Sequence, residues 1–357
     1  MTKHERFLAF ANFEPVDRVP RRAEWYIEST RTRMTAYLGD DPARHFNMDT
    51  GIGEGLTPPA GFRFPDYSAY HQEWLDNKDF SVACNGCGHL SHGFYHFTEY
   101  ISPLRNAKSF EELQRYPCVS NAGWSDEAMR RACDTAHAGG DYAALFVGHM
   151  YEDAWQVRGY EPFLIDLLTQ RDWAEYLLDR NYENNLRTAT AAAEAGYDCI
   201  MLGDDVANQQ TMMFKPEIWQ TVMKPRWAKV IAAAKAIKPD IHVWYHSDGN
   251  IWQILDELIE IGITILNPVQ PECIDPTAVR KRCGKHLAFD GCVGTQTVFP
   301  FGTPDDMRRT VRDLIDSLDG LQGGLMLSPT HVLEPEVPPE NVLAFFETCD
   351  SIRREPA

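Results

Sequence analysis

The 357-residue sequence has no apolar segment that approaches the roughly 18 residues of a membrane-spanning helix. It is also short of basic residues: 34 Lys and Arg stand against 52 Asp and Glu, a formal net charge of −18. This balance argues against a general nucleic-acid binder and against a polybasic membrane-surface protein, because both need positive charge to meet phosphates. The N-terminus, MTKHERFLAF, lacks an apolar segment followed by a cleavage site, so we expect a soluble, cytoplasmic protein.

A disulfide framework is also not indicated. The nine cysteines are an odd number and are scattered along the chain, as is typical of reduced thiols. Cys84 and Cys87, followed by His89 and His92, have the spacing of half a zinc site. However, no second Cys-x-x-Cys follows, and the histidines are closer together than a zinc finger requires. We interpret this segment as a glycine-rich loop with reduced cysteines, with a structural zinc as the alternative.

Two parts of the chain differ in their pattern. After Met1–Asn12, which predicts a short helix, residues 13–140 are irregular and rich in aromatic residues, Gly and Pro, which predicts loops and short strands forming a cap. From Asp141 onward, short apolar runs alternate with helical stretches, as in parallel βα units. The predicted strands are Tyr142–Val147, Asp198–Leu202, Ile241–Tyr245, Ile263–Leu266, Leu287–Phe289 and Gly324–Leu327. The predicted helices are Trp173–Ala195, Pro216–Ile237, Ile251–Ile261, Pro276–Cys283, Pro304–Leu318 and Glu340–Ile352.

At least six βα steps follow one another, and no Gly-x-Gly-x-x-Gly follows a predicted strand. This favours a (β/α)8 TIM barrel with an irregular N-terminal cap over a dinucleotide-binding sheet. Two further strands must come from the N-terminal part, with Val19–Ile27 as the first. We therefore predict a single domain over residues 1–357, in which residues 1–140 supply the early strands and a lid.

Polar side chains follow the predicted strands at the place where the chemistry of a parallel barrel collects. We expect them to face one cavity, although a barrel without a site would also carry some polar groups there. They are Glu152, Asp204, Asp205, Gln209, His246, Asp248, Gln270 and His331.

His246 and Asp248 stand two residues apart at a strand end, so both can reach one ligand. They would supply two metal ligands, or an imidazole oriented by a carboxylate. As an alternative, Asp248 caps a helix that begins near Asn250. His331 can equally be an ordinary loop histidine. The aromatic cap suits a lid over a planar, apolar substrate better than a platform for stacked bases, given the net charge.

Several segments resemble members of the uroporphyrinogen decarboxylase superfamily, and this likeness implies a (β/α)8 barrel. It covers nearly the whole chain and is weakest from Gly51 to Pro103. The segments are Glu5–Pro20, Trp155–Glu161, Gly203-Asp204-Asp205 with Gln209, His246–Gly249, Asn267–Pro271, Phe301–Pro304 and Val337–Val342.

The superfamily holds true decarboxylases and methyltransferases that exchange methyl groups with a corrinoid. The arginine-rich signature of the decarboxylases is missing, since the matching stretch reads VPRRAEWY from Val19 to Tyr26. The coenzyme-M branch of the methyltransferases binds zinc through His-x-Cys and a later Cys. His246 matches the first of these ligands, whereas Asp248 and His331 stand where the two cysteines would be.

The resemblance to the remaining members implies a cobalamin (corrinoid)-dependent methyltransferase that O-demethylates a methoxylated aromatic small molecule. The expected partners are this methyl donor and a separate corrinoid protein, with no nucleic acid and no membrane; a homodimer is left open. The alternatives are a decarboxylase-like carboxy-lyase, which would hold a carboxylated substrate through Arg21 or Arg22, and a non-catalytic ligand-binding barrel.

This interpretation gives roles to named residues. We expect His246, His331 and Asp248 to bind a divalent metal, with zinc the first candidate. Asp205 and Glu152 are expected to act with the two histidines in catalysis. The predicted substrate contacts are Trp25, Tyr151, Trp155, Asp204, Gln209, Tyr245, Asp248 and Gln270.

Overall fold

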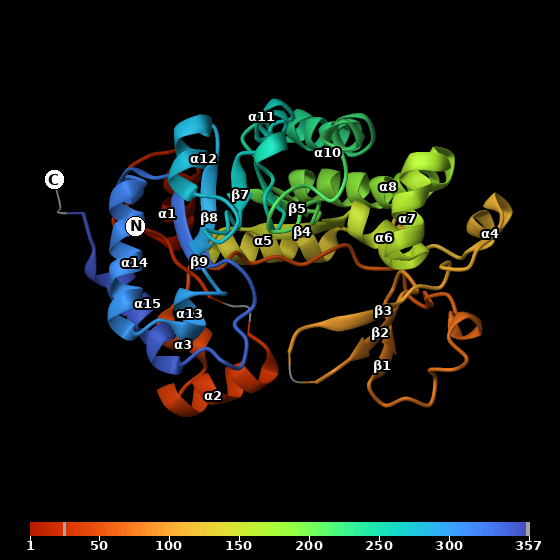
Figure 1. Cartoon of the computed structure of the whole chain (residues 1–357). Coiled ribbons are helices and arrows are strands. Elements are labelled where there is room, and N and C mark those ends of the chain that lie inside the picture. The colour runs from red at the N-terminus through yellow and green to blue at the C-terminus, as the bar shows by residue number, and fades with distance from the viewer. Residues whose placement is uncertain (24–25, 94, 355–357) are drawn as a thin grey trace.

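The computed structural model describes residues 1–23, 26–93 and 95–354. Its main body is a barrel of parallel strands wrapped by helices, with a small antiparallel sheet on one side (Figure 1). Six barrel strands pair in parallel in sequence order, and all lie within a few residues of their predicted positions. They are β4 (Ala144–His149), β5 (Cys199–Gly203), β6 (His242–His246), β7 (Ile265–Asn267), β8 (Ala288–Val293) and β9 (Leu325–Pro329).

The first N-terminal segment of the barrel lies beside β9. Arg22 N donates to Leu327 O at 3.1 Å, and Leu327 N donates to Pro20 O at 2.9 Å. Arg21 and Leu327 form a parallel bridge. The strand predicted at Val19–Ile27 therefore lies next to the last strand, and among its described residues the pairing with β9 is short.

A second segment, around Ile52, lies beside β4 and completes the circle. Ile52 N donates to Tyr142 O at 2.9 Å, and Ala144 N donates to Ile52 O at 3.0 Å. The two N-terminal segments are joined to each other by the bond from Asp49 N to Arg21 O at 3.0 Å. The fold is thus a (β/α)8 barrel, as predicted, with two short, irregular first strands.

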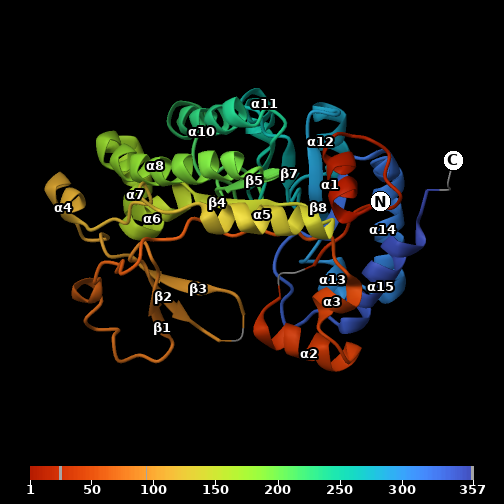
Figure 2. The ribbon, with the colours of Figure 1, turned by 180° about the vertical axis from the view of Figure 1, so that it is seen from behind.

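The helices run mostly along the outside of the barrel, as the two opposite views show (Figures 1 and 2). Within the part of the chain that the structure describes, no helix is both long and apolar enough to cross a membrane. The helices of the barrel are α6 (Tyr151–Arg158), α7 (Tyr160–Thr169), α8 (Arg171–Ala195), α9 (Pro216–Ile218), η2 (Trp219–Met223), α10 (Lys224–Ile237), η3 (Trp252–Ile254), α11 (Leu255–Glu260), α12 (Pro276–Cys283), α13 (Val298–Phe301), α14 (Pro304–Ser317), η4 (Gly320–Gln322) and α15 (Pro339–Ser351).

The helix predicted at Pro216–Ile237 contains a π-helical turn, η2, between α9 and α10. Pro225 lies in the first turn of α10 and has no N–H to donate to the preceding turn. The ladder of hydrogen bonds therefore shifts its spacing at this point, while the chain continues in the same direction.

Helix α1 (Lys3–Ala11) closes the bottom of the barrel. Its first turn is fixed by a capping box, in which Thr2 accepts from Glu5 N and Glu5 accepts from Thr2 N. Phe7 and Phe10 are buried against the inward-facing side chains of the strands. The ring of Phe7 stacks on that of Tyr142 at 3.9 Å. The helix predicted at Met1–Asn12 is therefore the floor of the barrel interior.

The N-terminal part is less irregular than the sequence suggested. The predicted short strands are present as an antiparallel sheet, with β2 paired to both its neighbours. However, five helical segments also lie among the described residues of this part, and α5 buries a face made chiefly of alanine instead of the large apolar residues that mark an amphipathic helix. The elements are α2 (Glu28–Leu38), α3 (Pro42–Phe46), η1 (Ser68–Tyr70), β1 (Phe80–Val82), β2 (Gly88–Ser91), β3 (Thr98–Ile101), α4 (Phe110–Arg115) and α5 (Glu127–Gly139).

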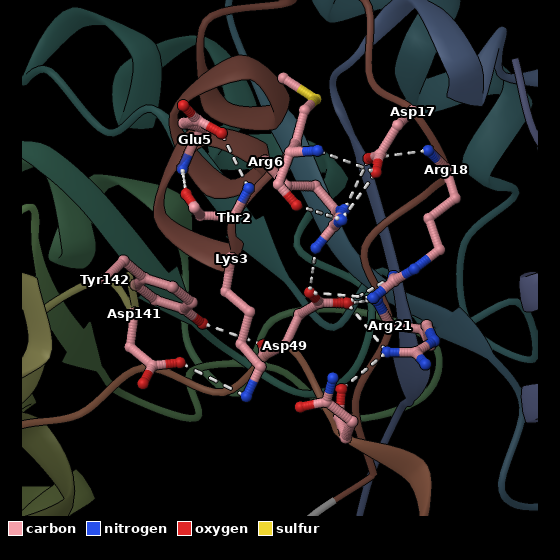
Figure 3. Close-up of polar contacts among 12 residues, drawn as sticks. Thr2, Lys3, Glu5, Arg6, Asp17, Arg18, Arg21, Asp49, Asp141 and Tyr142 are labelled. Carbon is pink, nitrogen blue, oxygen red and sulfur yellow. Dashed lines mark hydrogen bonds and ion pairs between the residues drawn. The ribbon is translucent and has the colours of Figure 1, made fainter. Parts of the chain in front are cut away.

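Asp49 is the centre of a buried cluster that ties α1 to both N-terminal barrel segments (Figure 3). Its Oδ1 accepts from Arg6 Nη1 at 2.9 Å, and its Oδ2 accepts from Arg18 Nη1 at 2.6 Å and from Arg21 Nη1 at 3.1 Å. Burial by itself would raise the pKa of Asp49, but its bonds to the arginines lower it. With 1% of its surface exposed, Asp49 offsets three guanidinium charges that would otherwise repel one another.

We expect Asp49→Ala to lower the free energy of unfolding by about 3–5 kcal/mol, because it removes the buried carboxylate that Arg6, Arg18 and Arg21 share. Urea denaturation measures this change. Asp40→Ala, which removes the exposed partner of Arg44, is the control and should change stability little. Equal denaturation midpoints for Asp49→Ala and wild type would show that the cluster does not hold the barrel closed.

Candidate metal centre and pocket at the barrel mouth

A cavity of about 400 Å³ lies inside the barrel below the carboxyl ends of its strands. Its lining is largely apolar and aromatic. Three lining side chains are nitrogen-containing polar groups, namely the guanidinium of Arg22 and the imidazoles of His149 and His246. Of the eight strand-end residues expected to face one cavity, His246 is the one that lines it. The other lining residues are Thr50, Gly51, Tyr142, Ala144, Phe146, Met201 and Trp244.

His246, the last residue of β6, is held in one orientation. Asn267 Nδ2 donates to Asp290 O at 2.7 Å, which leaves Asn267 Oδ1 as an acceptor. His246 Nδ1 lies 2.6 Å from this oxygen and donates to it. His246 Nε2 therefore points the other way, towards Asp205 Oδ1 at 3.4 Å and Asp248 Oδ1 at 3.8 Å. The structure thus brings His246 and Asp248 side by side.

The two carboxylates around His246 fit a divalent cation. Single donor atoms of Asp205, His246 and Asp248 all lie within 4.8 Å of one another. Asp248 Oδ1 is buried and has no hydrogen-bond partner among the described residues. Asp248 Oδ2 lies 3.6 Å from His331 Nε2, so His331 adjoins the group as predicted. An unsatisfied buried carboxylate oxygen next to an imidazole nitrogen is the donor set that zinc and related ions use.

Asp248 does not cap a helix. The turn that follows, η3, has no side-chain cap, and the N–H of Trp252 is instead bonded by Asn250 Oδ1 at 3.1 Å. Asp248 is held through its own N–H, which donates to Asp205 Oδ1 at 2.8 Å. The capping alternative is therefore wrong, and both oxygens of Asp248 are directed at histidines.

The charges of this group depend on one another. Burial acts to lower the pKa of His246, but the charges of Asp205 and Asp248 outweigh it and raise the pKa. Burial raises the pKa of Asp248 to about 7. Burial and the neighbouring imidazoles of His96 and His246 lower the pKa of His331 to about 4. Near neutral pH, His331 is therefore an uncharged imidazole, the form that binds metal ions.

His149 and Glu152 form a second pair at the same height in the barrel. His149 is level with Gly203, which in turn is level with His246. His149 Nδ1 lies 2.7 Å from Glu152 Oε2, and the same oxygen accepts from Asp205 N at 3.1 Å. Burial opposes protonation of His149, but its bond to Glu152 raises the pKa to about 10. The sequence analysis did not single out His149, although it ends β4 as His246 ends β6.

Asp204 supports the site from behind and does not line the cavity. Its Oδ1 accepts from the first backbone N–H groups of α6, those of Met150, Tyr151 and Glu152, at 2.8, 2.6 and 3.1 Å. Its Oδ2 accepts from Trp227 Nε1 at 3.1 Å. The Asp204 side chain is fully buried. The prediction that Asp204 contacts substrate is corrected: it fixes the start of α6, and with it Glu152.

Two of the tyrosines predicted to contact substrate lie in the outer core. Tyr245 stands between Trp244 and His246 on β6. Because side chains alternate along a strand, Trp244 and His246 point into the barrel and Tyr245 points away from its interior, where it is fully buried. Tyr151 is fully buried, with its ring against those of Phe163 and Phe214. Neither side chain lines the cavity at the mouth.

Trp155, on α6, lies outside the barrel mouth and faces the small sheet. Its ring packs edge-on against Tyr100 at 5.1 Å and Tyr160 at 5.5 Å. These three aromatic side chains line a separate pocket of about 310 Å³. The assignment of Trp155 to the substrate cavity is therefore corrected, because α6 turns it towards the cap.

Two glutamines occupy the rim and the loops. Gln209 is exposed and donates from Nε2 to Gln296 Oε1 at 2.7 Å. Gln270 is buried, and its Oε1 accepts from Gly249 N at 2.7 Å, which positions the loop that carries Asp248. Gln270 therefore affects the site indirectly, by positioning the loop that carries Asp248. Trp25, also predicted to contact substrate, lies outside the described residues.

The cap reaches the site through a contact that sequence reasoning missed. His96, from the segment between β2 and β3, is bonded through Nδ1 to Glu334 in the loop after β9. Tyr95 OH donates to Glu336 in the same loop. The ring of His96 also lies 4.5 Å from that of His331. The antiparallel sheet is therefore fastened over the loop that carries His331, as a lid would be.

The Cys84–Cys87 loop shows no metal site. Within residues 1–23, 26–93 and 95–354, these cysteines belong to no group with metal-ligand spacing. Cys87 is buried, and burial raises the pKa of its thiol to about 12. Cys84 and Cys87 are both free cysteines.

The His149–Glu152 pair gives a pH prediction. Because the folded pKa of His149 is raised, the stabilisation by this pair is complete below its ordinary pKa of 6.5 and is lost as the pH rises through about 10. In Glu152→Gln, burial then dominates, and the pKa of His149 should fall from about 10 towards 6.5 or below. NMR titration of the imidazole C–H signals measures this, with the exposed His286 as an unchanged control. An unaltered titration of His149 would contradict the assignment of Glu152 as its partner.

Comparisons with known proteins agree with this architecture. The profile of the uroporphyrinogen decarboxylase (URO-D) family matches residues 146–352, more than half of the chain. No curated protein matches the chain in sequence. Among solved structures, a methyltransferase from Methanosarcina mazei is similar in fold, with a TM-score of 0.68 and 18% sequence identity over 98% of this chain and 99% of that chain. The chain therefore belongs to the uroporphyrinogen decarboxylase family.

Proposed function

We propose that this protein is a metal-assisted methyltransferase that removes the methyl group from a methoxylated, aromatic small molecule and passes it to a corrinoid (cobalamin) held by a partner protein. The observation that carries the proposal is the orientation of His246. Its Nδ1 is fixed by Asn267, and its Nε2 is aimed at two carboxylates, at the rim of a largely apolar cavity.

The metal ligands would be Asp205, His246 and Asp248, with His331 close enough to join them through a small movement. A divalent ion there would act as a Lewis acid towards the oxygen that keeps the electrons of the broken methyl bond. Zinc suits this mixture of imidazole and carboxylate, and iron or manganese would also fit it.

The cavity supplies the rest of the chemistry through the chain's own side chains. Tyr142, Phe146, Met201 and Trp244 give it apolar walls for an aromatic ring. His149 is protonated near neutral pH and faces the same space, so it can donate a hydrogen bond to a leaving oxygen that gains negative charge. Glu152 keeps this imidazole charged and in place.

The methyl acceptor is proposed from likeness, not from a contact in this chain. Several sequence motifs resemble those of corrinoid-dependent members of the family, and the structure from Methanosarcina mazei is a methyltransferase. The acceptor would have to reach the mouth of the barrel, the end at which His246 and His331 lie.

A second candidate, a decarboxylase-like lyase, is favoured by one observation. Arg22 lines the cavity, and a guanidinium there could hold a substrate carboxylate. Its charge is already matched, however, since Arg22 Nη2 lies 2.5 Å from Asp290 Oδ2. Arg21 is engaged by Asp49 and Asp350 and takes no part in the cavity. Methyl transfer therefore remains the first proposal.

The metal is tested by binding. Protein purified without chelator should carry one divalent ion at the mouth, and His246→Ala or Asp248→Ala should lower its affinity at least about tenfold, because changes even to groups behind the ligands cost that much. Equilibrium dialysis with Zn²⁺ measures the affinity, and Gln209→Ala, at the rim, is the control. If His246→Ala binds Zn²⁺ at this site as tightly as the control does, the histidine acts as an acid or base instead.

The reaction is tested by giving the enzyme a methoxyarene and a reduced corrinoid protein, and following the phenol and the visible absorbance of the cobalt. His246→Ala and His331→Ala should each lower kcat about 10²–10³-fold, since they act where charge develops. Phe146→Ala, at the wall of the cavity, should raise KM more than it lowers kcat. Carbon dioxide released from an aromatic acid, with no corrinoid present, would favour the lyase.

A further inference from the structure

The barrel has a second cluster of potential metal ligands at the opposite end from the mouth. Asp198 immediately precedes β5, His4 belongs to α1, and His137 belongs to α5. His4 Nε2 lies 3.1 Å from Asp198 Oδ1, and His137 Nε2 lies 2.8 Å from Asp198 Oδ2. Two imidazoles from distant parts of the chain therefore address one carboxylate.

The charge of Asp198 calls for a cation at this point. The carboxylate is 5% exposed, and among the described residues it contacts no Lys or Arg, only the two histidines and the N–H of Ala143 at 2.8 Å. A buried carboxylate without a cation is costly. The two imidazole rings stack at 4.6 Å and an angle of 15°, so protonating both would place two like charges face to face. One divalent ion would supply the charge and use the lone pairs of both nitrogens.

The three side chains are close enough to share an ion. One ligand atom from each of His4, His137 and Asp198 lies within 4.8 Å of the other two, and each histidine faces a different oxygen of Asp198, at 3.1 and 2.8 Å. Donor atoms that share a tetrahedral zinc ion, with bonds of about 2 Å, lie about 3.3 Å apart, so a bound ion would draw the three ligand atoms together. His4 and His137 have 28% and 35% of their side chains exposed, which leaves a path for the ion and room for a water as fourth ligand.

The surroundings hold the three ligands in position. Cys133 Sγ lies 3.8 Å from Nδ1 of His137, the ring nitrogen that faces away from Asp198. His4 N donates to Gly140 O at 2.9 Å, which joins α1 to the end of α5. Outer contacts of this kind orient metal-binding imidazoles in other proteins.

We propose that His4, His137 and Asp198 form a structural binding site for a divalent transition-metal ion, with zinc preferred. The ion would clip α1, the floor of the barrel, to α5 and to the start of β5. This site lies at the end of the barrel away from the cavity, and the proposal does not depend on the proposed methyl transfer.

The test measures zinc per chain by equilibrium dialysis of the full-length protein in four forms: wild type, His246→Ala, His137→Gln and the double variant. Glutamine keeps an N–H donor within reach of Asp198 but is a poor zinc ligand. Wild type should bind two ions, each single variant one, and the double variant none. Zinc should also raise the Tm of His246→Ala and leave that of the double variant unchanged.

Two further variants make the result specific. In the His246→Ala background, His4→Gln should weaken zinc binding at least about tenfold, as His137→Gln does. His286→Gln, at an exposed histidine that does not belong to the group, should leave it unchanged. The proposal is overturned if the double variant binds zinc as His246→Ala does. Wild type could instead bind a single ion that is lost in His137→Gln and kept in His246→Ala. That result would support the site at His4, His137 and Asp198 and contradict the proposed metal site at the mouth.

Discussion

The cluster around Asp49 is the constraint on which the rest of the structure depends. A (β/α)8 barrel encloses its core only if the first and last strands meet, and here the first two strands are too short to be held by their backbone bonds alone. Asp49 binds Arg6 of the floor helix, and Arg18 and Arg21 of the first strand, through paired charges. Since these groups are buried, removing Asp49 would cost the three guanidinium groups the carboxylate that they share.

Closure of the barrel brings the strand ends to one level, and adjacent residues there take different tasks. Asp204 is turned back to hold the first turn of α6, whereas Asp205 faces His246 at the mouth. The residues that hold the site in position, such as Asp204, are therefore as polar as the residues of the site itself. The line from Asp290 through Asn267 to His246 shows the same principle, because each group fixes the hydrogen-bonding direction of the next.

Local sequence predicted much of this. The βα alternation after Asp141 gave all six later strands, since a strand buried on both sides is a short apolar run that stands out from the polar loops around it. Once the ends of these apolar runs were known, the polar residues that follow the strands could be located as well. The N-terminal part was harder, because its two barrel segments pair through only a few bonds and α5 buries alanines instead of large apolar residues.

What the sequence by itself determined is the class of fold, the end of the barrel at which the polar strand-end residues gather, and the residues His246, Asp248 and His331 as neighbours there. What only the tertiary structure decided is the direction of each side chain. Alternation and helix phase turned Tyr245, Tyr151 and Trp155 away from the cavity and turned His149 into it. A position at a strand end places a residue near the mouth, but the direction of its side chain is set by packing against residues far away in the chain.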